Sequence, residues 1–154
     1  MSTIDPQRPD IAAFIAEASR TLGKDLPTPK DVFAFGDSEA KLNDSLLALV
    51  LAGKKTGTAT YPIPDPLHWG PGDYAVVVDS ESRPRAVIRT VSLVRCAFQD
   101  VTEEFALSEA EGDYQAWREG HIWFWKESQK GTGFSEDSVI LCERFELVYP
   151  ETSQ

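Results

Sequence analysis

Two lysines and a row of threonines lie close together in residues 53–61, where residue type and spacing could support nucleophilic catalysis. Period-2 alternation puts three hydroxyl groups on one face of an extended strand, those of Thr56, Thr58 and Thr60. Lys54 and Lys55 lie where this face begins, and an amine that loses its proton on desolvation can activate a nearby hydroxyl. A structural interpretation stays open, because threonine favours strands and lysine favours helix C-termini.

A second candidate group is the acidic motif EAEGD at residues 109–113. Two carboxyl groups separated by one residue could exchange protons with a substrate, or could simply form the solvated end of a helix. The spacing at a helix end leaves open whether Glu109 or Glu111 faces inward.

Two further side chains could contact a ligand or serve the fold alone. Arg89 falls in an apolar row of an expected strand, so its charge needs a structural carboxylate or a ligand as partner. Trp69 lies in a proline-rich loop over residues 62–71, where it could border a ligand site or cover the core.

Composition excludes several classes of protein. The formal charge of −10 argues against extensive phosphate contacts with nucleic acid, although a local basic pocket is still compatible with it. The two histidines and two cysteines show no zinc-binding spacing, so we expect no metal or other cofactor. We also expect a cytoplasmic protein, because the sequence shows no secretory leader and no long apolar run, and the cysteines are separate thiols.

The elements that must position these residues are predicted from hydrophobic periodicity. Helices are expected over residues 10–22, 39–52, from 102, and 114–130, and strands over residues 56–61, 74–79, 85–95 and 138–148. Strand pairs joined by short turns, without alternating strand and helix units, favour an α+β fold. We expect a small, mainly antiparallel barrel or curled sheet with helices packed around it.

Five segments, in this order, resemble the ASCH-domain family (activating signal cointegrator homology), in particular its stand-alone bacterial members: FGDSEAKLNDSLLALVLAGKKTGTAT, PGDY, PRAVIRT, AFQDVTEEFALSEAEGDYQAWREGH and LCERFELVY. The similarity covers about residues 33–149. It implies a PUA-like β-barrel with surrounding helices over residues 31–150, preceded by an N-terminal helical extension over residues 1–30.

The resemblance also implies an activity and a set of site residues. One bacterial branch hydrolyses the acetyl amide of N4-acetylcytidine, and its pattern corresponds to Lys55 as base, Thr58 as nucleophile and Glu111 as acid. Residue type further suggests a substrate-binding set, which comprises Lys54, Tyr61, Trp69, Arg89 and Asp113.

The sequence departs from that branch around the nucleophile, where Gly57, Ala59 and Thr60 replace an isoleucine, an isoleucine and an arginine. The choice of substrate is therefore left open. Another stand-alone relative is a ribonuclease, so the alternative is an RNA-binding or RNA-cleaving domain that uses the same cleft. The expected partner is a modified nucleoside or single-stranded RNA.

Overall fold

The computed structural model describes residues 4–36, 39–128 and 131–151. The helical elements are α1 (Pro9–Leu22), α2 (Ala40–Leu51), η1 (Phe98–Asp100), α3 (Glu103–Ser108), α4 (Tyr114–Trp123) and η2 (Phe124–Ser128). The strands are β1 (Asp31–Phe33), β2 (Gly57–Thr60), β3 (Tyr74–Val78), β4 (Pro84–Ala97) and β5 (Val139–Tyr149). No helix among the described residues is long and apolar enough to cross a membrane.

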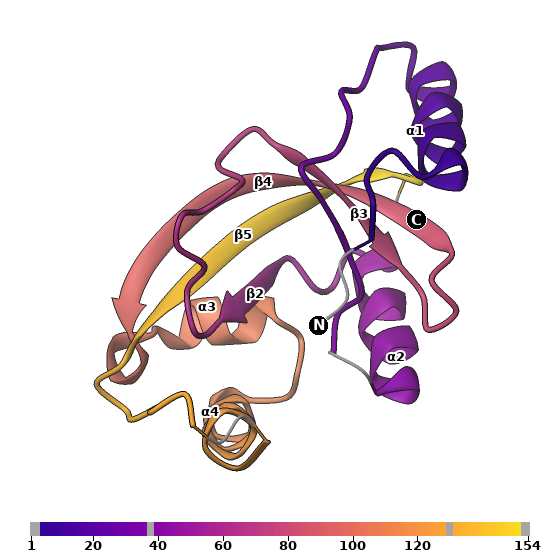
Figure 1. Cartoon of the computed structure of the whole chain (residues 1–154). Helices are drawn as coiled ribbons and strands as arrows, with labels where there is room; N and C mark the ends of the chain where they lie inside the picture. The colour runs from indigo at the N-terminus through magenta and orange to yellow at the C-terminus, as the bar shows by residue number, and fades with distance from the viewer. Residues whose placement is uncertain (1–3, 37–38, 129–130, 152–154) are drawn as a thin grey trace.

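The five strands form one sheet in the order β1-β3-β4-β5-β2 (Figure 1). Every neighbouring pair is antiparallel except β1 and β3, which run parallel. The β4–β5 pair shifts register near Val87 and again near Thr90, and such irregularities bend a strand. The two long strands accordingly curve along their length, and β2 lies along one end of β5.

The sheet is curled but open, so the expectation of a closed barrel is wrong. The edge strand β1 pairs only with β3 and the edge strand β2 only with β5. Closure requires edge strands long enough to pair with each other across the opening, and these span three and four residues. The mixed α+β class and the mainly antiparallel pairing are confirmed.

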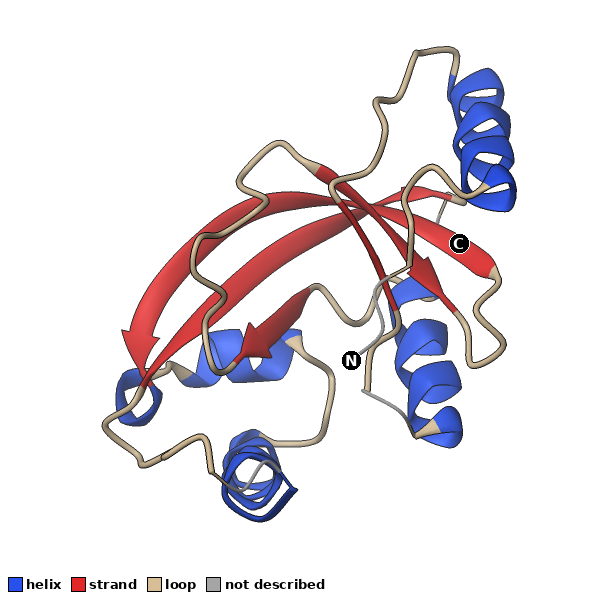
Figure 2. Cartoon of the chain, in the orientation of Figure 1, coloured by secondary structure: helices blue, strands red, loops and turns tan. Residues whose placement is uncertain are grey.

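Helices cover both faces of the β3 end of the sheet (Figure 2). Ile11 and Ile15 of α1 pack in one cluster with Val76 and Val78, which point to the same face. Val77 points to the opposite face and packs in a second cluster with residues of α2. Helix α1 therefore shares a core with the sheet. The division into two domains at residue 30 stays a prediction.

A third cluster joins α3, α4 and η2 to the far end of β5. Its buried members include Phe98, Trp117, Trp125, Ile140 and Cys142. Trp117 stacks on Phe98 with ring centroids 5.3 Å apart. This aromatic packing fixes α4 beside the end of α3, where the acidic motif lies.

The predicted elements agree with the structure except in two places. Residues 31–33, where no strand was predicted, form the edge strand β1. The helix predicted over residues 114–130 changes from α-helical to π-helical hydrogen bonding at Phe124, and residues 129–130 lie outside the described residues. Short strands and π turns depend on tertiary contacts and leave little periodic signal.

Candidate active site

Lys55 is fixed from both sides by the chain around it. Helix α2 ends at Leu51, Gly53 turns the chain with a φ of 75°, and the Leu49 carbonyl accepts the amides of both Lys54 and Lys55. The left-handed conformation of Gly53 is one that glycine adopts without strain. Thr56 then donates to the Ser108 carbonyl at 2.8 Å and accepts from the Phe145 amide at 3.0 Å.

The Lys55 side chain points into the protein. The residue is 2% exposed, and its Nζ donates to the carbonyl oxygens of Gly57 at 2.9 Å and Glu109 at 3.3 Å. The centroid of the Phe35 ring lies 5.1 Å from the same nitrogen. The Gly57 carbonyl belongs to the peptide bond that leads into Thr58, so the amine is held beside the backbone of the expected nucleophile.

Both glutamates of the acidic motif face this amine. Lys55 Nζ lies 3.6 Å from Glu109 Oε1 and 3.6 Å from Glu111 Oε2. The chain reverses sharply here, because Ala110 and Gly112 take left-handed φ values of 58° and 95°. The reversal brings side chains that are two residues apart to one cation, so both Glu109 and Glu111 face inward.

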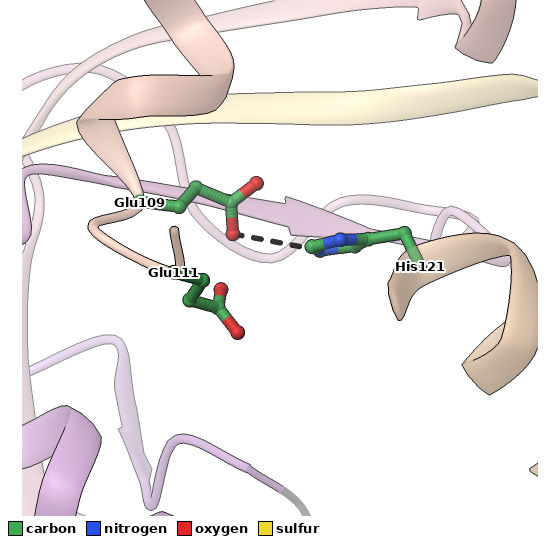
Figure 3. A group of neighbouring side chains, drawn as sticks. All are labelled: Glu109, Glu111 and His121. Atoms are coloured by element: carbon green, nitrogen blue, oxygen red, sulfur yellow. Dashed lines mark ion pairs between the residues drawn. The ribbon is translucent and has the colours of Figure 1, made fainter. Parts of the chain in front are cut away.

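The two carboxylates differ in their access to solvent. Glu109 is 1% exposed at the end of α3, and its Oε2 accepts from Trp117 Nε1 at 2.6 Å. Its Oε1 lies 3.7 Å from Nε2 of His121 on α4, as Figure 3 shows. Glu111 keeps 30% of its side chain exposed and lies at the entrance of the cluster.

The charges in this cluster shift one another's protonation. Burial raises the pKa of Glu111; the charge of Lys55 opposes this rise and that of Glu109 adds to it. Burial alone would raise the pKa of Glu109, but its hydrogen bond to His121 and the charge of Lys55 outweigh burial and lower it. Burial would lower the pKa of His121, but the hydrogen bond and charge of Glu109 outweigh it and raise that pKa. Glu111 therefore holds a proton more tightly than an exposed glutamate, and Glu109 less tightly.

Thr58 is half-buried on β2, with its Cα opposite that of Glu143 on β5. Directly opposed residues of an antiparallel pair project to the same face of the sheet. Glu143 is 8% exposed and is bonded to Thr90 Oγ1 at 2.8 Å and Trp69 Nε1 at 3.2 Å. The face that carries Thr58 thus also carries a buried carboxyl group, whose pKa burial raises.

Glu109, Glu111 and His121 each offer one potential metal-ligand atom, and these atoms lie within 4.8 Å of one another. The Lys55 amine lies 3.6 Å from both carboxylates. A metal ion in the same place would be repelled by the ammonium group. We therefore assign the cationic position of this cluster to Lys55.

Two of the expected substrate-binding residues serve the fold. The Tyr61 hydroxyl donates to the Thr132 carbonyl at 2.7 Å, and its ring packs against Phe134 at 5.2 Å, within the third core cluster. Asp113 caps α4, where its carboxylate accepts the Ala116 amide at 2.8 Å.

Three other expected binding residues lie at the surface or rim. Arg89 is not buried by its apolar row: its side chain is 40% exposed and lies 3.4 Å from Glu146, a structural carboxylate. Lys54 is exposed. Trp69 is half-buried, and its bond to Glu143 anchors the proline-rich loop over the face that carries Thr58.

Three residues at or beside the candidate site were not predicted to act there: Trp117 and His121 in the Lys55 cluster, and Glu143 opposite Thr58. Trp117 and His121 lie one helical turn apart, a spacing that puts them on one face of α4. That pattern indicates a shared face without indicating that the face meets Glu109. Glu143 occupies the same every-second-residue row of β5 as Leu141 and Phe145, a signal for inward orientation that the sequence does carry.

Comparisons with known proteins agree with this architecture. A model of the ASCH-domain family matches residues 31–149. The chain is similar to the crystal structure of protein EF3133 from Enterococcus faecalis V583, of family DUF984, with 29% identity, a TM-score of 0.77, and coverage of 90% of this chain and 92% of that chain. An ASCH domain from Lactobacillus crispatus JV V101 has the same fold, with 23% identity, a TM-score of 0.76, and coverage of 97% and 98%. A search of curated proteins found no match.

Proposed function

The chain belongs to the ASCH-domain family, and from this premise we propose that it hydrolyses the amide bond of an acylated pyrimidine nucleoside such as N4-acetylcytidine. The observation that carries the proposal is the position of the Lys55 amine. It is buried between the peptide that leads into Thr58 and the Glu111 carboxyl group, with Nζ 2.9 Å from one and 3.6 Å from the other. A base, a nucleophile and an acid are the groups that amide hydrolysis requires.

The hydrogen bonds of Lys55 suit a base. Nζ donates to two carbonyl oxygens, those of Gly57 and Glu109. When the Lys55 ammonium of the resting cluster loses one proton, these bonds use both N–H groups of the resulting neutral amine and leave its lone pair free to accept a proton. Phe35 and the core behind it limit the directions from which that proton can come.

In the proposed reaction, the Thr58 hydroxyl attacks the acyl carbonyl carbon while Lys55 takes the hydroxyl proton. The carbon–nitrogen bond breaks, and the proton of Glu111 goes to the departing amine of the nucleoside. Lys55 then passes its proton to Glu111 across their 3.6 Å separation, which restores both groups. A water molecule next attacks the Thr58 ester with Lys55 as base, and the acid is released as Thr58 regains its proton.

The raised pKa of Glu111 supports its role as the acid. Burial favours the neutral carboxyl form, so a larger share of the protein carries a proton there at neutral pH than an exposed glutamate would. The 30% exposure of its side chain leaves the group accessible to a leaving amine. Glu109, which is buried and bonded to Trp117, lacks that access and instead holds Lys55 in place.

The first experiment is incubation of the protein with N4-acetylcytidine and measurement of cytidine release by chromatography. Thr58→Val removes the hydroxyl at nearly constant volume and should lower turnover at least a hundredfold. Thr58→Ser should keep part of the activity. Thr60→Val, on the same strand and outside the proposed machinery, is the matched control and should retain full turnover.

Equal turnover in the Thr58→Val and Thr60→Val proteins would refute the nucleophile assignment. If the wild-type protein releases no cytidine, the alternative to test is cleavage or binding of single-stranded RNA. With a formal charge of −10, any RNA affinity should depend on a local basic contact and weaken steeply as salt rises from 50 to about 200 mM. Nucleoside hydrolysis involves no polyanion and should change little over that range.

A further inference from the structure

His121 takes no step in the proposed reaction, yet its ring is held in a defined orientation. Nδ1 lies 2.8 Å from the Trp117 carbonyl oxygen, which can only accept a hydrogen bond. Nδ1 must therefore carry the hydrogen. The ring also lies against Trp117, with centroids 4.6 Å apart, and against Trp125 at 5.0 Å. Nε2 is left as the nitrogen that faces the acidic motif.

The group that Nε2 faces makes the cationic form of the ring favourable. Nε2 lies 3.7 Å from Oε1 of Glu109, and Figure 3 marks this ion pair with a dashed line. The other carboxylate oxygen of Glu109 accepts a hydrogen bond from Trp117. A neutral ring with hydrogen on Nδ1 would direct a lone pair at that carboxylate. An imidazolium directs an N–H at it instead, so protonation of Nε2 replaces repulsion with attraction.

The charged groups around His121 come from two other segments. Lys55 precedes β2, Glu109 and Glu111 follow α3, and His121 itself lies on α4. On β5, Cys142 stays neutral at physiological pH, because burial raises the pKa of its thiol to about 12. With Lys55 and Glu109 charged and opposite in sign, Glu111 and His121 are the groups whose protonation sets the net charge of the cluster.

One proton on this pair makes the cluster neutral, and it can sit in either of two places. Glu111 can be a neutral acid beside a neutral imidazole, or a carboxylate beside an imidazolium. Two protons leave an excess positive charge, and none leaves an excess negative charge, in a site where Glu109 and Lys55 are almost fully buried. Uncompensated charge is costly there, so the state with one proton is favoured over a broad pH range.

We propose that Glu111 and His121 share one proton across the buried Glu109 carboxylate, and that His121 is a positioning residue that tunes Glu111 as an acid. The second part rests on the proposed function. His121 competes with Glu111 for the shared proton, so the carboxyl group releases it to the leaving amine more readily than it would alone. Without this competition, Glu111 would hold its proton too tightly to be an effective acid at neutral pH.

The shared proton can be tested in the resting protein without any substrate. The chain has two histidines, so a ¹H–¹⁵N long-range correlation spectrum recorded across pH contains two imidazole systems, which His68→Gln assigns. His68 lies on another loop with its side chain 52% exposed and supplies the reference signal. We expect the His121 titration midpoint to move to lower pH in Glu111→Gln, because the neighbouring negative charge is gone, while the His68 curve stays in place.

Superimposable His121 titration curves in the wild type and Glu111→Gln would overturn the proposal. A neutral His121 ring with its hydrogen on Nε2 would overturn it as well. Thermal unfolding of both proteins verifies that the comparison is between folded states. The titration needs no substrate, so its outcome does not depend on whether the protein hydrolyses a nucleoside. The shared proton and the proposed function can therefore be refuted separately.

The tuning role is tested by the pH profile of N4-acetylcytidine hydrolysis. In His121→Gln, Glu111 keeps its proton to higher pH, so the alkaline limb of the pH–rate profile should shift to higher pH. Turnover at pH 7 should fall roughly tenfold, less than the hundredfold or more expected when the acid itself is removed. If turnover falls by the same factor at every pH and the alkaline limb of the profile does not shift, His121 has only a structural role. That result would overturn the proposal that His121 tunes Glu111.

Discussion

At the scale of single residues, the site depends on a buried lysine whose amine is surrounded by protein oxygen atoms in place of water. Lys55 Nζ lies within 3.6 Å of two carbonyl oxygens and two carboxylate oxygens, and its side chain is 1% exposed. A buried charge requires this degree of compensation to be tolerated. The two carboxylates in turn rely on the charge of Lys55 to offset the cost of their own burial.

Removal of the Lys55 amine should therefore destabilise the fold as well as abolish chemistry. Lys55→Met keeps most of the side-chain volume but leaves Glu109 and Glu111 without their nearest cation. We expect the free energy of unfolding, measured with urea, to fall by about 3 kcal/mol. The matched control is Lys54→Met. Loss of the exposed Lys54 amine should change the free energy of unfolding by no more than about 0.5 kcal/mol. Equal effects of the two substitutions would contradict the structural role of the buried amine.

Glu143 gives a second test at the residue scale, through pH. Burial raises its pKa, and its bonds to Thr90 and Trp69 oppose that rise only in part. A folded-state pKa above the unfolded value means that the folded protein holds this proton longer. The stabilising contribution is thus present below about pH 4.5 and is lost as pH rises through the folded value.

Glu143→Gln, a neutral side chain of the same shape, should remove this dependence. Urea unfolding from pH 4.5 to 8.5 should show a shallower loss of stability with rising pH in the variant than in the wild type. Glu111 and His121 also have raised pKa values and leave a remaining slope of the same sign. A variant that loses stability more steeply than the wild type would show that Glu143 is ionised and favourable in the fold.

At the scale of elements, the site exists because β2 and α3 approach each other closely. Gly57 begins β2 and supplies the carbonyl that holds Lys55, while the Thr56 amide donates to Ser108 at the end of α3. A Cβ at position 57 would overlap Ser108 Oγ and would lie 3.3 Å from Phe105 Cε1. The short distance between strand and helix therefore excludes a side chain at this position.

Gly57→Ala should consequently destabilise the protein by about 1–3 kcal/mol through overpacking. Ser108→Ala removes the hydroxyl that the new methyl group meets, so the double variant should recover part of the loss. A double-mutant cycle on unfolding free energies measures this coupling. Strictly additive changes in unfolding free energy would mean that there is no steric conflict between the side chains at positions 57 and 108.

At the scale of the whole molecule, the sheet separates a stabilising layer from the candidate site. Helix α1 packs on the face that carries Val76 and Val78, whereas α2 and Phe35, the ring beside Lys55, pack with Val77. Successive residues of a strand point to opposite faces, so one short strand supports both layers. The N-terminal helix thereby adds to the core without contributing a side chain to the Lys55 cluster.

Ile11→Ala tests this separation. Ile11 is fully buried, so its truncation should lower the free energy of unfolding by about 3 kcal/mol, while Glu17→Ala on the exposed side of α1 should have little effect. Below the unfolding transition, the His121 imidazole signals should match those of the wild type. A displaced His121 spectrum in the folded Ile11→Ala protein would show that α1 and the site are coupled through the sheet.

Local sequence alone determined most of the elements and the residue types of the candidate site. Hydrophobic periodicity places the long strands and the main helices, and the glycine after α2 marks where Lys55 leaves the helix. These features depend on near neighbours in the chain, whose spacing is fixed by helix and strand geometry. The lysine pair, the threonine row and the acidic motif could therefore be named as candidates, and the family resemblance selected Lys55, Thr58 and Glu111 among them.

Only the tertiary structure decided how these candidates are surrounded. Whether Glu109 or Glu111 faces inward depended on the left-handed Ala110 and Gly112, and both do. The meeting of His121 with Glu109 required α4 to pack beside the end of α3 through Trp117 and Phe98. Likewise, the sheet stays open because two short edge strands never meet. Such contacts join segments far apart in sequence, and their geometry follows from packing across the whole core rather than from any local pattern.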